Sequence, residues 1–384
     1  MNVLALNCGS SSVKFRLLAV DAGAPAVAAR ALAQRTDAAR GADQEGAIQR
    51  AIETARAAAP IDAVGHRVVH GGTRFTAPTP IDDEVIAAIE ALEALAPLHN
   101  GPSLVGIRAC RTALGAATPM VAVFDTAFHA TLPDSAARYA LDAALAERHG
   151  LRRFGFHGIS YAWATARAAA LLGRPASQLR LVVLHLGSGC SAAAIDGGRS
   201  VDTSMGLTPL EGLVMATRSG DVDPALPARL ARREHVGAEE VERWLNERSG
   251  LLGLGGSADV RDLLTREATD ARARLALEVF CHRARKYLGA YLAVLGGADA
   301  VVFTGGIGEH QPEIRRRIAG GFEWCGLTLD RGRNAVTRGT EAVVSAVGSP
   351  IGALVVPADE ERMIAAETAQ CLTGATGVRP RPSR

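Results

Sequence analysis

The chain has 384 residues and a mass of 39.9 kDa, which exceeds the usual size of a single hydrophobic core, so two domains are expected. Apolar residues make up 48% and charged residues 21%, which argues against disorder, collagen-like repeats and coiled coil. A net charge of +2 excludes the strongly basic surface that nucleic-acid or anionic-membrane binding requires. No apolar run approaches the ~18 residues of a membrane span, and no signal peptide is evident. We therefore expect a cytoplasmic protein with a small-molecule partner.

The chain begins with a strand, a turn and a second strand. Residues 2–6 and 13–20 have the apolar, β-branched bias of strands, and residues 7–11 between them are small and polar. The same pattern recurs later, with strands at 181–186 and 190–195 around a Gly-Ser-Gly turn. Since nothing repeats at 20 to 50 residues, this recurrence predicts two related halves rather than a solenoid.

Helical spacing of apolar residues follows each of these hairpins. It predicts helices over 46–58, 82–95, 103–114, 134–149 and 270–295. Ser160 is predicted to cap a further helix that ends at Leu172. Strands that alternate with helices indicate an α/β fold.

The first turn contains Ser10, Ser12 and Lys14, and only one other lysine, Lys286, occurs in the chain. Backbone N–H groups, hydroxyls and an ammonium group suit a phosphate. An ordinary hairpin turn is the alternative. Ser11-x-x-Lys14 also matches the nucleophile pair of a penicillin-recognising acylase, but the companion motifs of that class are absent.

Two later segments combine a buried strand with glycines. The segment His185 to Gly189 ends the recurring strand, and residues 301–309 form a strand that runs into Gly305-Gly306. Two hairpin turns suited to phosphate, followed by a strand that ends in Gly-Gly, are typical of the actin and hexokinase-like nucleotide-binding fold.

Several charged or polar residues lie where ligands usually bind. Arg67 lies in an apolar, glycine-flanked strand, where it meets either an anion or a local carboxylate. Asp125 directly follows the strand 120–124, where it either contacts a ligand or caps a helix. His157 is flanked by glycines and aromatic residues, and a polar loop over 202–224 contains Arg218.

Ten segments of the chain are similar, in order, to those of the acetate and butyrate kinase family. They are LNCGSSSVKF, GHRVVHGG, PLHN, VAVFDTAFHATLP, RRFGFHGIS, LHLGSG, DTSMGLTPLEGL, TRSGDVDP, FTGGIGEH and DEERMIAAE. The resemblance implies two duplicated actin/hexokinase-like (ribonuclease H-like) domains with a nucleotide cleft between them. It implies an N-terminal domain over 1–130, onto which a C-terminal helix at 363–384 packs, and a nucleotide-binding and dimerisation domain over 131–362.

The resemblance also implies a reaction and its participants. It implies reversible phosphorylation of acetate by ATP to acetyl phosphate, with Mg²⁺ or Mn²⁺, in a cytoplasmic homodimer. Propionate is the alternative substrate, because one methylene in an apolar pocket discriminates weakly. A sugar or polyol kinase of the same fold is a further alternative, but it needs a catalytic-base aspartate and many polar groups for the sugar, whereas Val69 and Leu98 are apolar. A nucleotide-sensing actin relative is another alternative, and it does not need Arg67, Asp125, His157 and Arg218 together.

The family resemblance assigns a role only to those residues of this chain that match a residue of a family motif. The resemblance assigns Asn7 and Glu360 to Mg²⁺, Ser10, Ser12 and Lys14 to phosphate, and Arg67 to the substrate. It assigns catalysis to Asp125, His157 and Arg218, and the substrate methyl to Val69, Leu98 and Pro209. It assigns the nucleotide to His185, Leu186, Gly187, Ser188, Gly189, Asp259, Val260, Arg261, Gly306, Ile307, Gly308, Glu309 and His310.

The chain departs from the family pattern at a few of these motifs. Ser188 and His310 stand where relatives usually have asparagine, and Cys190 stands where they have alanine. Ala358 and Asp359 replace a usual Thr-Asn before the two glutamates. These differences bear on one polar contact to the nucleotide and on the geometry around the metal.

Overall fold

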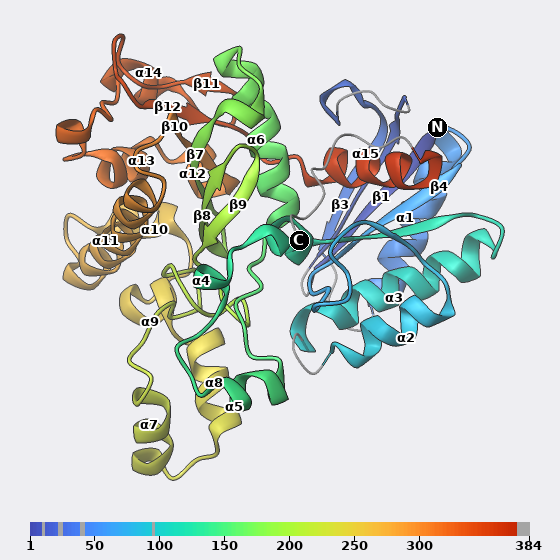
Figure 1. Ribbon diagram of the computed structural model, residues 1–384, viewed down its shortest axis with the longest axis horizontal. Coiled ribbons are helices and arrows are strands. Elements are labelled where there is room, and N and C mark those ends of the chain that lie inside the picture. Colours follow the sequence, from blue (N-terminus) through green and yellow to red (C-terminus); the bar gives the residue numbers. More distant parts are fainter. Residues whose placement is uncertain (10–11, 22–25, 39–42, 94–96, 375–384) are drawn as a thin grey trace. The chain divides into compact units, whose positions relative to one another are not determined.

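The computed structural model describes residues 1–9, 12–21, 26–38, 43–93 and 97–374 (Figure 1). The chain forms two compact units. Unit 1 contains Met1–Thr131, Phe156–Trp163 and the chain from Asp359 onward, and unit 2 contains Leu132–Gly155 and Ala164–Ala358. Each unit contains a six-stranded mixed sheet with helices, so the prediction of two related α/β halves is confirmed. Within the described ranges, no helix has both the length and the apolar character that a membrane crossing requires.

The sheet of unit 1 has the order β3-β2-β1-β4-β6-β5. Its strands are β1 (Asn2–Cys8), β2 (Ser12–Ala19), β3 (Arg30–Ala38), β4 (Ala63–Val68), β5 (Thr79–Pro80) and β6 (Met120–Phe124). The hairpin β1–β2 is antiparallel, whereas β1, β4 and β6 run parallel to one another. The carboxyl ends of three central strands therefore lie at one edge of the sheet.

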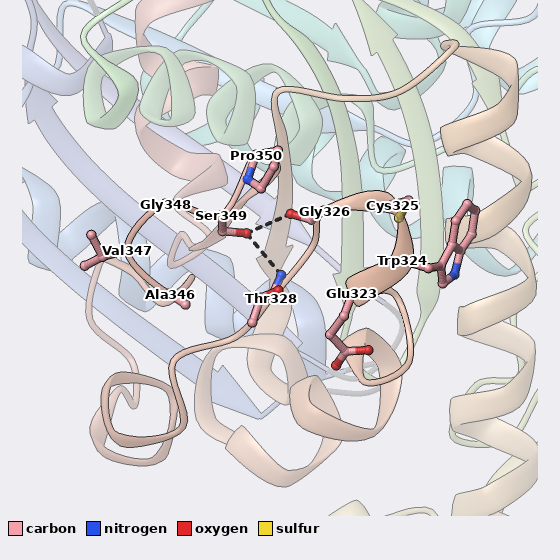
Figure 2. Close-up of a pocket in the computed structure, with 10 residues that line it drawn as sticks. All are labelled: Glu323, Trp324, Cys325, Gly326, Thr328, Ala346, Val347, Gly348, Ser349 and Pro350. Carbon is pink, nitrogen blue, oxygen red and sulfur yellow. Dashed lines mark hydrogen bonds between the residues drawn. The ribbon is translucent and has the colours of Figure 1, made fainter.

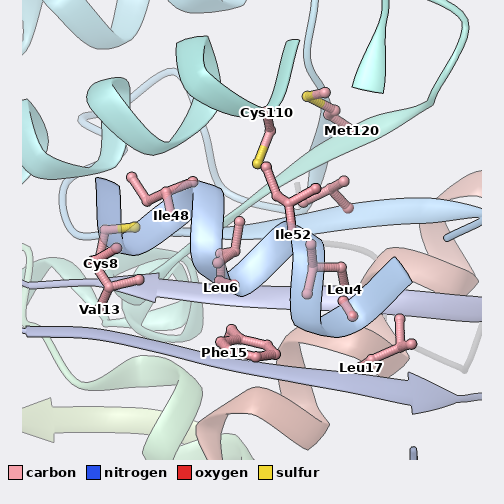
Figure 3. Close-up of a cluster of buried hydrophobic side chains, with 14 residues drawn as sticks. Leu4, Leu6, Cys8, Val13, Phe15, Leu17, Ile48, Ile52, Cys110 and Met120 are labelled. Atoms are coloured by element: carbon pink, nitrogen blue, oxygen red, sulfur yellow. The ribbon is translucent and has the colours of Figure 1, made fainter. Parts of the chain in front are cut away.

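Helices cover both faces of this sheet. On one face, Leu4 and Leu6 of β1 pack with Ile48 and Ile52 of α1 (Asp43–Ala58) and with Cys110 of α3 (Pro97–Leu114) (Figure 3). Because side chains alternate along a strand, residues such as Asn7 point to the other face. That face is covered by α15 (Glu360–Thr373), which contacts β1, β4 and β6.

Unit 2 repeats this sheet topology. The order is β11-β12-β10-β7-β8-β9, and the strands are β7 (Arg180–Leu186), β8 (Cys190–Asp196), β9 (Arg199–Thr203), β10 (Ala300–Thr304), β11 (Ala342–Val343) and β12 (Gly352–Val355). β7 and β8 form an antiparallel hairpin, and β7, β10 and β12 are parallel. The long helix α11 (Ala271–Val294) packs on β7 and β8. Asp270 caps it by accepting hydrogen bonds from backbone N–H groups, close to the predicted start.

Shorter elements connect these layers. They are η1 (Ala26–Ala28), α2 (Asp83–Ala91), η2 (Asp125–Thr131), α4 (Asp134–Ala137), α5 (Ala143–His149), α6 (Gly158–Leu172), η3 (Ala176–Gln178), α7 (Leu226–Glu234), α8 (Ala238–Glu247), α9 (Gly250–Gly255), α10 (Val260–Arg266), α12 (Gly305–His310), α13 (Pro312–Ala319), η4 (Glu323–Cys325) and α14 (Arg331–Val336).

Two sequence-based predictions of helices are wrong in detail. The stretch 134–149 is not one helix, because Arg138 leaves the helix to form an isolated β-bridge with Arg152, which separates α4 from α5. Ser160 does not cap a helix, since α6 already begins at Gly158 and Ser160 is buried inside it. The last helix runs over Glu360–Thr373, whereas the family resemblance implied 363–384; residues 375–384 lie outside the described part.

Candidate active site

Three polar residues gather at the carboxyl edge of the unit 1 sheet, one from each parallel strand. Asn7 lies near the end of β1, Arg67 near the end of β4, and Asp125 immediately after β6. Carboxyl ends of parallel strands are the usual position of ligand-binding groups in α/β sheets. The fourth member is Glu360, the first residue of α15.

These four side chains form one hydrogen-bonded chain. The Arg67 guanidinium donates to Asp125, with its NH2 nitrogen 2.6 Å from Oδ2 and Nε 3.2 Å from both oxygens. Its NH1 nitrogen donates to Asn7 Oδ1 at 2.9 Å, and Asn7 Nδ2 donates to Glu360 Oε2 at 2.8 Å. Residues that are distant in sequence are thus fixed relative to one another, as a preorganised site requires.

The charges in this cluster are strongly coupled. Burial raises the pKa of the Asp125 carboxyl, and the facing Arg67 guanidinium lowers it. Burial opposes the charge of Arg67, but Asp125 and Glu360 outweigh it and raise the pKa of Arg67 above its ordinary value. We treat the pair as ionised, because the two-oxygen contact suits a carboxylate. The guanidinium is still 17% exposed, so it can also face an anion.

His157 belongs to the same cluster through its backbone. Its backbone N–H donates to the Asp125 carboxylate. The residue has φ 58°, a left-handed conformation that a non-glycine residue adopts at a cost, and such strain concentrates at functional sites. The next residue must be glycine, because a Cβ on Gly158 would lie 1.9 Å from the Asp125 carbonyl oxygen. The backbone of His157 is therefore fixed beside the Arg67–Asp125 pair.

Of the other residues predicted in unit 1, Ser12, Lys14 and Val69 lie in the described part of the chain. Lys14 pairs with Asn7 across the β1–β2 hairpin, and Ser12 begins β2. Lys14 also lines a pocket of about 360 Å³, whose other residues are Phe15, Arg16, Gln34, Arg35, Thr36 and Glu361. Val69 is buried directly after β4. Ser10 lies outside the described residues, and Leu98 lies in the first turn of α3 with a side chain outside the described part.

In unit 2, two of the predicted nucleotide segments are neighbours. His185 and Leu186 end β7, and Gly187, Ser188 and Gly189 form the turn to β8. Gly306, Ile307, Gly308, Glu309 and His310 form α12 directly after β10, the parallel neighbour of β7. Gly305 joins them at φ 75°, and a Cβ there would lie 2.7 Å from the Leu186 carbonyl oxygen. A close approach of backbone to backbone therefore joins the Gly305 segment to the end of β7 within unit 2.

The loop after β9 brings Pro209 and Arg218 together. The Arg218 guanidinium donates to the Pro209 carbonyl oxygen at 3.0 Å. The loop is tied to the glycine turn, because the Ala216 N–H donates to the Ser188 carbonyl oxygen at 3.0 Å. Arg218, Pro209 and the turn at Ser188 thus lie in one region of unit 2.

Sequence reasoning missed the residues that hold this loop. Arg153 donates to the carbonyl oxygens of Thr203, Ser204 and Met205 at 3.0 to 3.2 Å, and to Glu211 Oε1 at 2.6 Å. Tyr139 donates to the same Glu211 carboxylate. Arg153 is part of the RRFGFHGIS segment, so the motif was visible, but only the fold reveals that its arginine supports a loop fifty residues away.

The remaining unit 2 prediction is a pair at the start of α10. Asp259 caps this helix and accepts from the Arg261 guanidinium, whose NH2 nitrogen lies 2.6 Å from Oδ2. The hydrogen bond from Arg261 holds the pKa of Asp259 below its ordinary value. Arg261 is 77% exposed and Val260 is buried. The contacts of Asp259 and Arg261 are mainly with each other, so their assignment to the nucleotide stays a prediction.

The residues predicted to hold Mg²⁺ offer oxygen donors of the right type. Glu360 provides a carboxylate that accepts a hydrogen bond from the Asn7 amide nitrogen, while the Asn7 amide oxygen accepts from Arg67. Mg²⁺ is commonly held by one or two carboxylates, with phosphate and water oxygens completing its coordination. Among the described residues there is no group of three or more His, Cys, Asp or Glu suited to a metal. The donor set therefore fits a metal that arrives with a phosphate, with Asn7 orienting Glu360.

A second pocket, of about 510 Å³, lies elsewhere in unit 2 (Figure 2). It is lined by Glu323 to Gly326, Thr328 and Ala346 to Pro350. Inside it, Ser349 Oγ donates to the Gly326 carbonyl oxygen at 2.8 Å and accepts from the Thr328 N–H at 3.0 Å. None of the predicted site residues lines it.

Comparisons with known proteins agree with the geometry. The model of the acetokinase family matches residues 2–366. The acetate kinase of Leifsonia xyli subsp. xyli is 55% identical over 314 residues, which cover 82% of this chain and 79% of that protein. The crystal structure of Porphyromonas gingivalis acetate kinase superposes with a TM-score of 0.87 at 38% identity, covering 97% of this chain and 99% of that one. A propionate kinase from Francisella tularensis subsp. tularensis SCHU S4 gives a TM-score of 0.85 at 36% identity, covering 95% and 98%.

Proposed function

This chain belongs to the acetokinase family, and we propose that it transfers the γ-phosphoryl group of ATP reversibly to acetate, forming acetyl phosphate. The observation that supports this most directly is the partly exposed Arg67 guanidinium, held by Asp125 at the carboxyl edge of the sheet. A fixed guanidinium suits a planar carboxylate or a phosphoryl group.

The reaction needs little covalent help from the protein. An acetate carboxylate is already a nucleophile, and the obstacle is its repulsion from the triphosphate. Positioning and neutralisation of negative charge are therefore the main contributions, as in other phosphoryl transfers. We propose direct in-line transfer, with no phosphorylated intermediate on the enzyme.

In unit 1, Arg67 binds the acetyl or phosphoryl oxygens, and Asp125 holds its guanidinium in place. His157 donates a hydrogen bond to an equatorial phosphoryl oxygen, while Lys14 and the hydroxyls of Ser10 and Ser12 contact phosphate. On the family resemblance alone, we assign Val69, Leu98 and Pro209 to contact with the substrate methyl. The support for these roles is the side-chain cluster at the strand ends and the match to family motifs.

The proposed metal is Mg²⁺, with Glu360 as its protein carboxylate and Asn7 as the residue that orients it. When bound, Mg²⁺ neutralises charge on the β- and γ-phosphate oxygens. The donor chemistry of this pair supports the proposal.

In unit 2, we assign Arg218 to the charge that develops during transfer, with His185 as a second donor. The turn from Gly187 to Gly189 contacts phosphate through its backbone, and residues 306–310 and 259–261 contact the nucleoside. The assignments of the turn 187–189 and of residues 306–310 are supported by the close contact between the end of β7 and the start of α12. On the family resemblance alone, we also propose a cytoplasmic homodimer.

Propionate is the second candidate substrate. The similarity to the Francisella propionate kinase is nearly as high as that to the Porphyromonas acetate kinase. One methylene in an apolar pocket contributes only about 1 to 3 kcal/mol of discrimination.

A hydroxylamine trap for acyl phosphate tests the proposal. The purified chain is incubated with ATP, Mg²⁺ and acetate, propionate, butyrate or glycerol in parallel. We expect hydroxamate with acetate and with propionate, and none with glycerol. ADP release with glycerol but no hydroxamate would favour a polyol kinase, and ATP binding without any turnover would favour a nucleotide sensor.

A further inference from the structure

The start of α15 is attached to the β1–β2 hairpin at two consecutive residues. Asp359 caps the helix, and both of its carboxylate oxygens lie 2.7 Å from the NH1 nitrogen of Arg16 on β2. Glu360, the next residue, accepts from Asn7 on β1. Two adjacent residues of one helix are thus anchored to two adjacent strands.

The register of the hairpin places these anchors close together. Arg16 pairs with Ala5, and Lys14 pairs with Asn7, so Arg16 and Lys14 point to the sheet face that α15 covers. Both residues line the pocket of about 360 Å³ that also includes Glu361. The Arg16 and Asp359 side chains are only 21% and 18% exposed. Their ion pair therefore lies beside the proposed metal carboxylate without reaching Asn7 itself.

We infer that the Arg16–Asp359 ion pair positions Glu360, and so sets how tightly the enzyme binds the metal–nucleotide complex. The inference rests on the proposed function, and it treats both residues as positioning residues that touch neither substrate nor metal. A helix start held at Glu360 alone can pivot about that contact, whereas the second anchor at Asp359 fixes the direction of the carboxylate. Partners that orient a metal ligand typically contribute about 10- to 100-fold in metal affinity.

Removal of the Arg16 charge separates a positioning role from a purely electrostatic one, because the two predict opposite changes in metal binding. If only Coulomb forces act, removing this positive charge should strengthen binding of the cation to the enzyme–analogue complex, and it should weaken binding of the metal-free analogue, which is the more negative ligand, more than binding of its Mn²⁺ complex. If Arg16 acts by positioning, its removal weakens binding. The informative variants are Arg16→Met and Asp359→Asn, because asparagine still caps a helix while it lacks the charge. Asp37→Asn is the matched control, since Asp37 pairs with Arg35 within β3 of the same sheet.

The experiment uses the full chain, Mn²⁺ as a spectroscopic probe, and the non-hydrolysable ATP analogue AMPPNP. Electron paramagnetic resonance measures Mn²⁺ bound to the enzyme–analogue complex, with the analogue alone as the blank. Calorimetry in EDTA measures metal-free binding of the analogue, and thermal unfolding verifies the fold. We expect Arg16→Met and Asp359→Asn to weaken Mn²⁺-dependent binding at least about tenfold. We expect metal-free binding to change less than twofold, and Asp37→Asn to match the wild type.

The double variant tests whether the two residues act as a unit. If they do, Arg16→Met with Asp359→Asn costs no more than the larger single change, whereas independent effects multiply. Unchanged or tighter Mn²⁺ binding in Arg16→Met overturns the inference, and so do multiplying effects. Failure of the proposed function is a separate result, because it appears as wild-type protein that forms no hydroxamate.

Discussion

The two sheets have the same topology but present different chemistry at their strand ends. In unit 1, the ends of β1, β4 and β6 present the side chains of Asn7, Arg67 and Asp125, which hold one another. In unit 2, the ends of β7 and β10 present the turn at Gly187 and the backbone at Gly305. The position after β4 is Val69, whereas the position after β10 is glycine. One arrangement of strands thus supports charged side chains in one unit and close backbone approach in the other.

This difference separates two means of binding a phosphorylated ligand. A side-chain cluster provides full charges in fixed directions, and a glycine turn provides N–H groups with room for a ligand to approach. Two side chains are exceptions in unit 2, since Arg218 comes from a loop rather than from a strand end and His185 lies near the end of β7. Substitutions in the two units should therefore impair the enzyme in different ways.

The largest effect is expected for Arg218→Ala. Loss of one charged donor at the transferring group typically lowers the rate about a hundred- to a thousandfold. The fold should persist, because Arg218 lies in a loop and its guanidinium donates to the Pro209 carbonyl oxygen and the Met215 sulfur of the same loop. Steady-state kinetics with ATP and acetate measures the change, and Arg232→Ala on the exposed surface of α7 is the control. Normal turnover in Arg218→Ala would remove this residue from the mechanism.

Gly305→Ala should damage unit 2 through its backbone. The new Cβ meets the Leu186 carbonyl oxygen at 2.7 Å, and φ 75° is unfavourable for alanine, so we expect a loss of about 1 to 3 kcal/mol in unfolding free energy. Displacement of α12 should also weaken nucleotide binding about tenfold or more. Calorimetric titration with ADP measures this, with Val69→Ala as the comparison in unit 1. The Val69→Ala variant should bind ADP as the wild type does, and only its KM for acetate should change.

His66 should make the folding of unit 1 sensitive to acid. It is buried in β4, and burial lowers its pKa to about 3. In the unfolded chain its pKa is about 6.5, so below that pH the unfolded state binds the extra proton and folding stability falls. Between pH 6.5 and 5 this contributes a loss of about 2 kcal/mol.

His66→Leu should remove that part of the pH dependence. Denaturant unfolding at pH 7 and pH 5 measures the free energy of unfolding in both proteins. We expect the difference between the two pH values to be smaller in the variant by about 2 kcal/mol. Equal pH dependence in both proteins would mean that His66 titrates normally in the fold.

The sequence predicted the hairpins β1–β2 and β7–β8 and the glycine turns well because their signals are local, but it did not predict β3, β9 or β12. The β7 and β8 strands and the Asp270 cap follow directly from residue patterns. It failed at residues 134–149, where helical spacing continued but a bridge from Arg138 interrupts the helix. It also missed Arg153, since a contact with carbonyl oxygens fifty residues away has no local pattern. A single sequence does not reveal which distant residues contact each other in the fold.

Substitution of Ser188 should have the smallest effect. It tests whether the glycine turn of unit 2 contacts the nucleotide through its backbone or through a side chain. If the unit 2 turn works through its backbone, its exposed side chain matters little, and the turn stays fixed by the hydrogen bond from Ala216 to the Ser188 carbonyl oxygen. Ser188→Asn, which introduces the residue usual in relatives, should therefore change the KM for ATP less than about threefold, as exposed substitutions usually do. Initial rates over a range of ATP concentrations measure this. A change of tenfold would show that the side chain at position 188 contacts the nucleotide, and the division between a side-chain unit and a backbone unit would then fail at this turn.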